Sequence, residues 1–541
     1  MSFETRLISP LEKVFPSDPL KAKIYDETTV LHGEPVSFQL AVKADDLKLG
    51  VKIEIDSPIS AHIQVGIVEL VASMMPNYKN HDDYLLKTTP GLYPDPIVTK
   101  DAYGLVHEQW NGFWVYVQTK GVKPNDYPIK LKVIHEETVV AVEEFTLRVL
   151  DIPVKFHGIK RTEWFYLDCI ADLHRVDMLS DAHFELIEKY VENYVEHGGN
   201  MILTPLFSPP LEMFVGGQRP TVQLVEIRKF VDTYHYNFEL LERFMDLCLA
   251  KGVLYFEMNH LFSQWGAEYA PKIFAWVDGS YEQLFGWHTR ADRDLYKDFL
   301  ASFLHALQQF LQEKNWEHLC HFHISDEPNS SNIHHYETAK NIIRNAGLQA
   351  PIFDALSEFD FYQRGLVEVP VASTNHIDVF VKNQVPDLWA YYCCMEHHSY
   401  LSNRFLNMSG LRTRIIGLQL YVAGISGFLH WGYNHWYGHK CLNQQLNPYH
   451  NTDADRGFPS GDAFLVYPGE KGPVSSIRLK QLQLAFSDIG LCKTLEEKIG
   501  REGVLEMIHS HGVIDFKHYP QSDDWFLDLR KGLIHALGES I

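Results

Sequence analysis

Two adjacent acidic residues, Asp326 and Glu327, follow the run HFHIS and precede Pro328. Proline removes a backbone donor and fixes φ, so a strand over this run ends here. Two carboxyl groups held this close disfavour simultaneous ionisation, because each negative charge raises the pKa of the other. A carboxylate beside a carboxylic acid suits acid–base catalysis. Since adjacent Asp and Glu residues are common on protein surfaces, this candidate catalytic pair depends on its structural setting.

The residues before the pair alternate in character. In a strand, His321, His323 and Ser325 share one face, whereas Phe322 and Ile324 point the other way. A polar inner face and an apolar face toward covering helices are typical of a barrel strand.

Residues 156–494 alternate short apolar runs with longer stretches of helical periodicity, as β/α units do. Eight such runs predict a (β/α)8 barrel of the TIM type, with an open doubly wound sheet as the alternative. The predicted strands are TEWFYLD, NMILTPLF, VLYFEMNHLF, CHFHISDEP, PIFDALS, IDVFVKN, LWAYYCC and GFLHWGYNHW.

Several of these strands end in aromatic or amide side chains. Active sites of such barrels lie at the carboxyl ends of the strands, where these side chains would meet the acidic pair. An aromatic ring can stack on the apolar face of a sugar, and polar groups can bind its hydroxyls. Although aromatic strand residues are more often core, their convergence predicts a glycosidase. The candidate substrate-binding residues are Trp164, Asn259, Tyr391, Trp431, Tyr433 and Asn434.

The flanking regions predict a multidomain α/β protein. Residues 1–155 contain short alternating runs such as PVSFQLAV and GFWVYVQTK, which are typical of an antiparallel β-sandwich. Residues 495–541 follow the predicted last barrel helix and form a short C-terminal appendage. We therefore expect an N-terminal sandwich, a catalytic barrel over 156–494 and this appendage.

Composition narrows the possible partners. The 541 residues carry 70 Asp and Glu against 48 Lys and Arg, a formal net charge of −22. Such a charge opposes binding to nucleic acid and to anionic membranes. No window has 18 consecutive apolar residues, so no membrane passage is expected. The start MSFETRLISPLEKVF lacks the apolar stretch of a secretory signal, and the seven cysteines lie mostly in apolar runs, so a cytoplasmic protein is expected.

Longer motifs point to a family. The strand ending in SDEP, the runs LWAYYCC and RIIGLQLYVAGISGFLHWGYNHW, and GDAFLVYPGEKGPVSSIRL together resemble the domain of unknown function 4091, whose characterised members form glycoside hydrolase family 123. The resemblance extends from about residue 10, where GEPVSFQLAV is similar to that family's N-terminal sandwich, to about residue 490.

This resemblance implies an exo-acting, retaining β-N-acetylgalactosaminidase in which the substrate's own 2-acetamido oxygen is the nucleophile. Asp326 would orient the acetamido group, and Glu327 would protonate the leaving oxygen and later activate water. The implied partner is a small oligosaccharide or glycoside with a terminal 2-acetamido sugar, and no cofactor or metal is needed. After SIRL only Asp488 matches the family's acidic helix, which leaves the choice between galacto and gluco sugars open.

Two other functions fit parts of the sequence. A metal-dependent barrel hydrolase is suggested by His321 and His323, with His260 and His430 as further ligands, because such a site needs three or four convergent donors. A noncatalytic carbohydrate-binding protein would use the same sandwich and barrel, but the intact Asp326 and Glu327 pair disfavours it. A nucleotide-binding enzyme is not indicated, since the chain has no GxGxxG or Walker-type loop.

Overall fold

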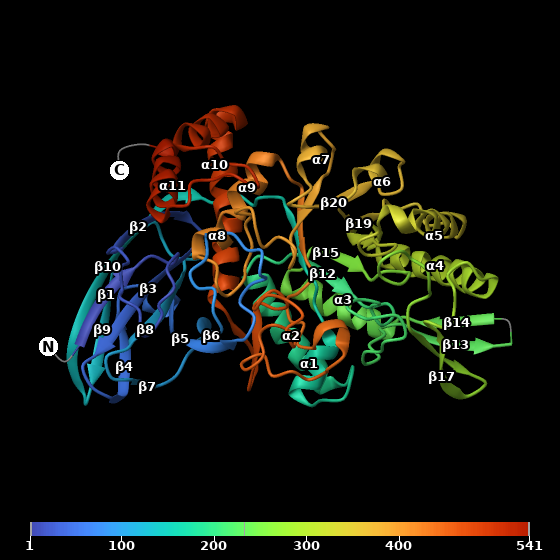
Figure 1. Cartoon of the computed structure of the whole chain (residues 1–541), viewed down its shortest axis with the longest axis horizontal. Helices are drawn as coiled ribbons and strands as arrows, with labels where there is room; N and C mark the ends of the chain where they lie inside the picture. Colours follow the sequence, from blue (N-terminus) through green and yellow to red (C-terminus); the bar gives the residue numbers. More distant parts are fainter. Residues whose placement is uncertain (1–2, 232, 539–541) are drawn as a thin grey trace.

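The computed structural model describes residues 3–231 and 233–538, which form a sheet-rich N-terminal region followed by a barrel-like α/β region (Figure 1). The N-terminal strands lie at one end of the molecule, and the helices and strands that follow extend to the other end.

Two five-stranded sheets make up the N-terminal region and share one apolar core. Phe38 and Phe145, one from each sheet, stack with their ring centroids 3.9 Å apart. The expected antiparallel pairing holds for most neighbours, but β2 and β10 pair in parallel. One sheet has the order β1 (Phe3–Ile8), β3 (Pro35–Ala44), β8 (Trp110–Gln118), β5 (Ile63–Ser73) and β6 (Gly91–Val98). The other has β2 (Glu27–His32), β10 (Thr138–Pro153), β9 (Asn125–His135), β4 (Lys48–Asp56) and β7 (Tyr103–Leu105).

The second region is built on one eight-stranded parallel sheet. A single parallel bridge between Phe322 and Ile352 links its two end strands, so the sheet forms a nearly closed barrel. The strand order is β18 (Cys320–Phe322), β15 (Tyr255–Met258), β12 (Met201–Thr204), β11 (Lys160–Glu163), β22 (Gly427–His430), β21 (Trp389–Tyr391), β20 (Val369–Ser373) and β19 (Phe353–Leu356).

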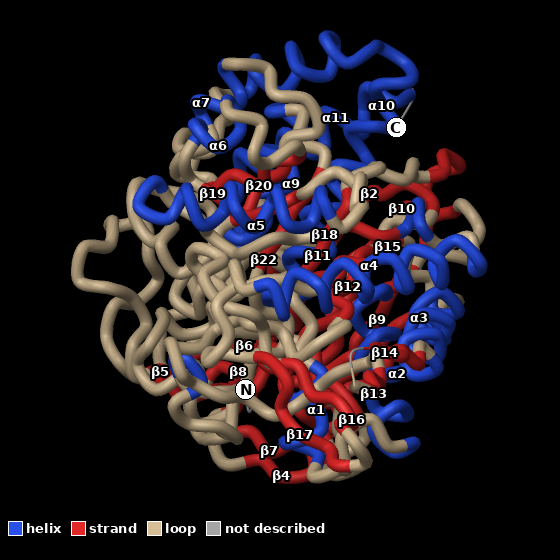
Figure 2. Tube along the Cα trace, turned by 90° about the vertical axis from the view of Figure 1, so that its right-hand side faces the viewer, coloured by secondary structure: helices blue, strands red, loops and turns tan. Residues whose placement is uncertain are grey.

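Helices connect and cover these strands (Figure 2). In α4, for example, Phe299, Phe303, Leu307 and Phe310 are buried at a spacing of three or four residues, so one face packs on the sheet. The helices are α1 (Leu167–His174), α2 (Asp181–Glu196), α3 (Glu239–Lys251), α4 (Asp294–Lys314), α5 (Ile333–Asn345), α6 (Phe359–Gln363), α7 (Asp378–Lys382), α8 (Gly410–Arg414), α9 (Ile416–Ala423), α10 (Ile477–His511) and α11 (Asp523–Gly538).

Two smaller sheets are inserted into the loops of the barrel. One contains β13 (Glu226–Phe230), β14 (Thr233–Asn237), β16 (Ile273–Val277) and β17 (Ser280–Phe285), and it lies at the end of the molecule away from the N-terminal sheets (Figure 1). The other is the hairpin of β23 (Val466–Gly469) and β24 (Gly472–Ser475).

The predicted number of barrel strands is confirmed, but one of the predicted strands is wrong. The run IDVFVKN contains the short helix α7, and the strand in this position is β20, Val369–Ser373. The β-branched residues of the run resemble a strand, yet only Phe380 of α7 is buried, as in a helix that covers a sheet with one side.

The C-terminal region is continuous with the last barrel helix. Helix α10 runs from Ile477 to His511 through the expected boundary at residue 495, with a non-helical φ of 73° at Gly500. Helix α11 packs back on α10, where Arg530 bonds Asp488 at 2.9 Å. Asp488 also binds Arg414 of α8 at 2.7 Å, so this carboxylate ties three helices together.

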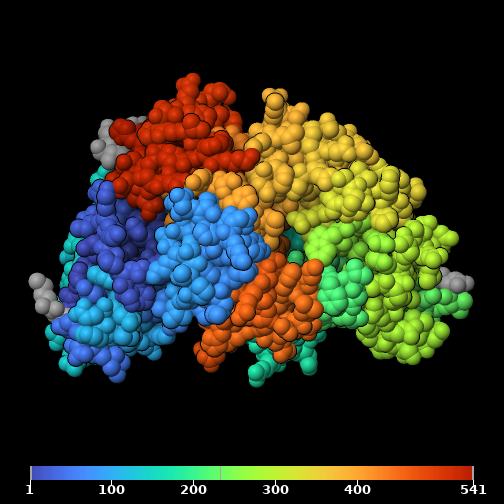
Figure 3. All heavy atoms as spheres, viewed as in Figure 1, coloured from blue at the N-terminus to red at the C-terminus, as the bar shows by residue number. Residues whose placement is uncertain are grey.

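Ion pairs and backbone bonds join the N-terminal sheets to the barrel. Arg478 of α10 binds Asp95 of β6 at 2.8 Å with both side chains fully buried. Figure 3 shows the light-blue segment that follows β5 packed beside the orange loops that follow β22. There the backbone N–H of Ser460 donates to the carbonyl of Met75 at 2.8 Å. The two regions therefore form one continuous structure around the barrel mouth.

Among the described residues, no helix has the length and the apolar character required to cross a membrane.

Candidate active site

The acidic pair lies just beyond the end of β18, where the chain leaves the barrel wall. The carbonyl of Asp326 accepts a bond of 3.0 Å from the backbone N–H of Trp265, in the loop after β15. The N–H of Glu327 donates to the carbonyl of Ala355 in β19 at 3.1 Å. Glu327 has a φ of 43°, in the left-handed region that non-glycine residues rarely adopt. The pair is therefore held between β15 and β19 in a strained conformation, as residues at functional sites often are.

Asp326 is almost completely buried, with 6% of its surface exposed. Its Oδ2 accepts a hydrogen bond of 2.8 Å from Nε2 of Gln264. Burial and the neighbouring charge of Glu327 raise the pKa of Asp326 well above its usual range, although the bond from Gln264 works in the opposite direction.

Glu327 is partly exposed, and two aromatic side chains hold its carboxylate. The hydroxyl of Tyr391, at the end of β21, donates to Oε1 at 2.8 Å, and the Trp265 side chain is a second donor. Burial raises the pKa of Glu327, whereas these two hydrogen bonds lower it. Since the pKa values of both Asp326 and Glu327 are raised, the pair retains a proton more readily than two isolated carboxyl groups would.

Three further carboxyl groups lie close enough to interact electrostatically with the pair or with one another. Burial, with the charge of Glu327 as a further cause, raises the pKa of Glu212 to about 7 and that of Glu396 to about 8. Burial also raises the pKa of Asp462 to about 7, and its Oδ2 accepts a bond of 3.0 Å from Trp431 Nε1. The site thus combines many hydrogen-bond acceptors with carboxyl groups that titrate near neutral pH.

Two of the six predicted substrate-binding residues contact these carboxyl groups. Tyr391 binds Glu327, and Trp431 binds Asp462 while remaining 8% exposed. Trp265, which the sequence analysis missed, is more open, with 39% of its surface exposed.

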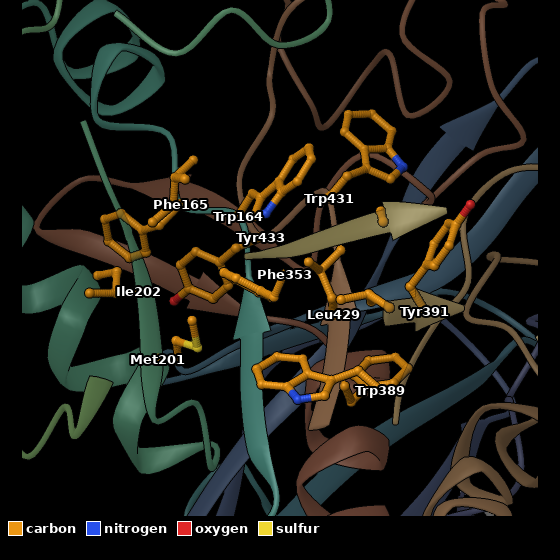
Figure 4. Packing of buried hydrophobic residues seen from close by; sticks show 14 of the residues in the cluster. Trp164, Phe165, Met201, Ile202, Phe353, Trp389, Tyr391, Leu429, Trp431 and Tyr433 are labelled. Atoms are coloured by element: carbon orange, nitrogen blue, oxygen red, sulfur yellow. The ribbon is translucent and has the colours of Figure 1, made fainter. Parts of the chain in front are cut away.

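The other four predicted residues have the contacts of structural side chains. Tyr433 is fully buried, stacks on Phe165 at 5.2 Å and donates to Asn193 at 2.8 Å (Figure 4). Asn434 is fully buried and bonds the backbone N–H and carbonyl of Tyr166 at 2.8 and 2.9 Å.

Asn259 bonds the backbone of Phe207 and His260, also without exposure. Trp164 is 1% exposed and donates to Glu257 inside the barrel at 2.7 Å. The side chains of Tyr433, Asn434, Asn259 and Trp164 thus stabilise the barrel and the ends of its strands.

The histidines proposed as metal ligands do not form one set. His321 packs edge-on against Tyr255 and Phe353, and His430 bonds Asp462 and Arg404.

His260, His323 and Asp354 do approach one another, with their nearest donor atoms within 4.8 Å. Both ring nitrogens of His323, however, bond carboxylates, Glu257 at 2.6 Å and Asp354 at 2.7 Å. Burial lowers the pKa of His323, but these two partners outweigh it and raise the pKa to about 9, so at neutral pH His323 is an imidazolium without a free lone pair. As arranged, this group is a buried ion cluster and does not fit a metal.

Several residues that support Asp326 and Glu327 were not predicted, because they do not lie at the ends of the predicted strands. Gln264 and Trp265 lie in the loop after β15, and Glu212 and Glu396 lie in loops without a strong pattern. Asp462 lies in the GDAF motif, and Asp354 is the only polar side chain in the buried strand FDAL, which could have marked it.

Comparison with known families gives the decisive observation. The model of the glycoside hydrolase 123 catalytic domain matches residues 164–495, more than half of the chain. The chain belongs to glycoside hydrolase family 123. The expected family is thereby confirmed, and the protein is a glycosidase by class. The comparison with curated proteins found no match.

One solved structure shows the same fold. A family 123 glycoside hydrolase from Clostridium perfringens, studied for glycolipid glycan hydrolysis, superposes with a TM-score of 0.76 at 16% identity, covering 99% of this chain and 97% of that one.

A Bacteroides ovatus GH5 xyloglucanase has a TM-score of 0.29 at 8% identity, with coverage of 86% and 98% of the two chains. A family 39 hydrolase from Bacteroides cellulosilyticus has a TM-score of 0.33 at 8% identity, with coverage of 81% and 80%. These two scores are too low to support any functional comparison.

Proposed function

We propose that this glycosidase is an exo-acting, retaining β-N-acetylhexosaminidase of the β-N-acetylgalactosaminidase type, and that its substrate supplies the nucleophile. The observation that carries the proposal is the Asp326 and Glu327 pair, each with its own polar partner, at a barrel strand exit in a family 123 domain. The glycolipid glycan hydrolysis studied in the Clostridium perfringens relative supports a glycan substrate for this chain too.

Each carboxyl group has one role in the proposed reaction. Glu327 donates its proton to the glycosidic oxygen as the bond from C1 to that oxygen breaks. The acetamido carbonyl oxygen attacks C1 and closes an oxazolinium ring, while the carboxylate of Asp326 accepts a hydrogen bond from the acetamido N–H and stabilises the positive charge. Glu327, now ionised, removes a proton from water, and the water oxygen attacks C1 and reopens the ring. Two displacements at C1 retain the β configuration.

Substrate binding is proposed to set the protonation states that this reaction needs. In the free site, burial raises the pKa of Asp326 strongly, which favours a proton there. A bound acetamido N–H would give Asp326 a hydrogen-bond donor and favour its ionised form. The shared proton would then reside on Glu327, which is the acid that must deliver it.

The side chains around the pair support a sugar-binding role. Trp265 and Trp431 offer ring surface, and Tyr391 fixes Glu327. Carboxyl oxygens of Glu396 and Asp462 can accept hydrogen bonds from sugar hydroxyls. We retain Tyr391 and Trp431 as proposed substrate-pocket residues and assign Trp164, Asn259, Tyr433 and Asn434 to its support.

The proposed substrates are short glycosides without negative charge near the terminal sugar, because five carboxyl groups surround the site. The seven cysteines are unpaired and five are buried, which is compatible with the reducing cytoplasm expected from the sequence.

Hydrolysis of aryl 2-acetamido-β-galactosides and β-glucosides, beside their 2-hydroxy analogues, tests the proposal. Wild type is expected to hydrolyse only the 2-acetamido compounds, and Asp326→Asn and Glu327→Gln to lose most of that activity. Equal turnover of the 2-hydroxy analogues would refute substrate assistance. Loss of activity on chelation would instead favour the metal-dependent hydrolase, and glycan binding without turnover would favour the noncatalytic alternative.

A further inference from the structure

One buried carboxylate holds the chain segment that leads to the catalytic pair. Oδ1 of Asp354, in β19, accepts from Nδ1 of His323 at 2.7 Å. Oδ2 accepts from the backbone N–H groups of Ile324 at 3.0 Å and Ser325 at 3.3 Å. Asp354 therefore binds three consecutive residues immediately before Asp326, and none of these four side chains is exposed.

The opposite side of the segment is held by the loop after β15. The hydroxyl of Ser325 donates to the carbonyl of Ser263 at 2.8 Å and accepts from the backbone N–H groups of residues 266 and 267 at 3.3 and 3.2 Å. The segment is thus fixed between two neighbouring parts of the barrel wall.

The strained backbone of Glu327 depends on this support. A φ of 43° persists only where surrounding contacts determine the conformation. The N–H of Glu327 bonds the carbonyl of Ala355, the residue after Asp354, so β19 holds both ends of the turn. A shift of β19 side chains would move the proton donor relative to its substrate.

The ion cluster around Asp354 also places a positive charge beneath the pair. His323 bonds Asp354 and Glu257, and its charge lowers the pKa of Asp326. This effect favours the ionised Asp326 that the proposed reaction requires.

From these contacts we infer that Asp354 is a positioning residue, which fixes residues 323–325 so that Asp326 and Glu327 reach the acetamido group and the glycosidic oxygen at the same time. The inference rests on the proposed function for its catalytic consequence. Asp354 lies behind the segment and contacts no reacting atom.

The variant Asp354→Asn keeps the size of the side chain but turns one acceptor into an NH2 donor. That donor would face either the N–H of His323 or the backbone N–H groups, so one set of bonds is lost. Misplacement of a catalytic group by about 1 Å can cost about 100-fold in rate. With an alkyl 2-acetamido glycoside, kcat is therefore expected to fall about 100-fold while KM changes less than about threefold.

A comparison of two leaving groups distinguishes misplacement of Glu327 from partial unfolding of the variant. An aryl leaving group needs little help from Glu327, so its kcat is expected to fall only about tenfold. An inactive fraction of protein would lower both rates equally, and equal losses would overturn the inference. Tyr336→Phe is the matched control, because it removes only the hydroxyl that donates to Asp354 at 2.5 Å, and its kcat is expected to stay within about threefold of wild type.

Hydrogen–deuterium exchange gives a measurement that does not depend on activity. Peptides covering residues 320–330 are expected to exchange faster in Asp354→Asn, while peptides from the N-terminal sheets keep the wild-type rate. Unchanged exchange in 320–330 would overturn the inference. If wild type hydrolyses no 2-acetamido glycoside, the proposed function fails, and exchange alone still decides whether Asp354 holds the segment.

A second variant covers the case in which Asp354→Asn does not fold. Ser325→Ala removes the hydroxyl that bonds Ser263, on the other side of the same segment. It is expected to show the same greater loss with the alkyl than with the aryl leaving group, and an equal loss with both would overturn the inference.

Discussion

The hydrogen bond from Tyr391 to Glu327 gives a prediction with a definite sign. The Tyr391 hydroxyl donates a hydrogen bond of 2.8 Å to Oε1 of Glu327. This bond stabilises the ionised form of Glu327 and so lowers its pKa. A hydrogen bond to a charged group contributes about 1.5–3 kcal/mol. Because one pKa unit corresponds to about 1.36 kcal/mol, removing this bond in Tyr391→Phe should raise the pKa of Glu327 by about 1–2 units. Since Glu327 is partly exposed, we expect the lower end of this range.

The direction of the effect on activity follows from the role of Glu327 as an acid. Only the protonated form delivers a proton, so activity is lost as the pH rises through the pKa of the pair. In Tyr391→Phe the alkaline limb of the kcat/KM profile should therefore move upward by about one pH unit. The position of this limb gives an apparent pKa that belongs to Asp326 and Glu327 as a coupled pair. It is measured between pH 4 and 9 with an aryl 2-acetamido glycoside.

Tyr433→Phe provides the comparison for this experiment. Its hydroxyl bonds Asn193 of α2 and not Glu327, so the alkaline limb should stay at its wild-type position. An alkaline limb that does not move in Tyr391→Phe, or that moves to lower pH, would refute the acid role of Glu327 as derived from this bond.

Three further predictions concern other parts of the structure. Glu327→Gln should lower kcat/KM by about 10²–10⁴-fold for an alkyl glycoside and much less for an activated aryl glycoside, and equal losses in steady-state assays would contradict the role of Glu327 as proton donor. Asp95→Asn leaves Arg478 buried without its charge partner and should lower the free energy of unfolding by about 3–5 kcal/mol in denaturant titrations; an unchanged midpoint would show that the pair contributes little. Chelator treatment should leave activity intact, because both ring nitrogens of His323 are occupied by carboxylates, and a loss restored by added Zn²⁺ would contradict this.

Local patterns in the sequence predicted the parts of the fold that depend on local physics. The alternating runs PVSFQLAV and GFWVYVQTK identified β3 and β8, because side-chain alternation follows directly from strand geometry. The run IDVFVKN misled, since a one-turn covering helix with β-branched residues has the composition of a strand. Helix α10 continues through the predicted boundary at residue 495, and its helical geometry is first interrupted at Gly500.

Residues of the candidate site could be predicted only where a polar or reactive side chain lies at the end of a predicted strand. Asp326 and Glu327 follow one barrel strand and Tyr391 ends another, so the geometry of a barrel brings them together. Tyr433 follows a strand in the same way, but its orientation depends on packing against Phe165, which no local pattern encodes. Gln264 lies in a loop, where its position depends on tertiary contacts alone.

The contacts between the N-terminal sheets and the barrel bear on whether the two regions of this enzyme can be exchanged separately. Tyr78 bonds Cys394, and Asn80 bonds His397 at 3.0 Å, so a loop of the N-terminal region lines the barrel mouth. A barrel expressed alone would lose this rim together with the partner of Arg478. Exchange of N-terminal regions between relatives would therefore change the contacts at the barrel mouth, and a chimaera should carry the rim loop and the barrel loops that contact it from the same parent.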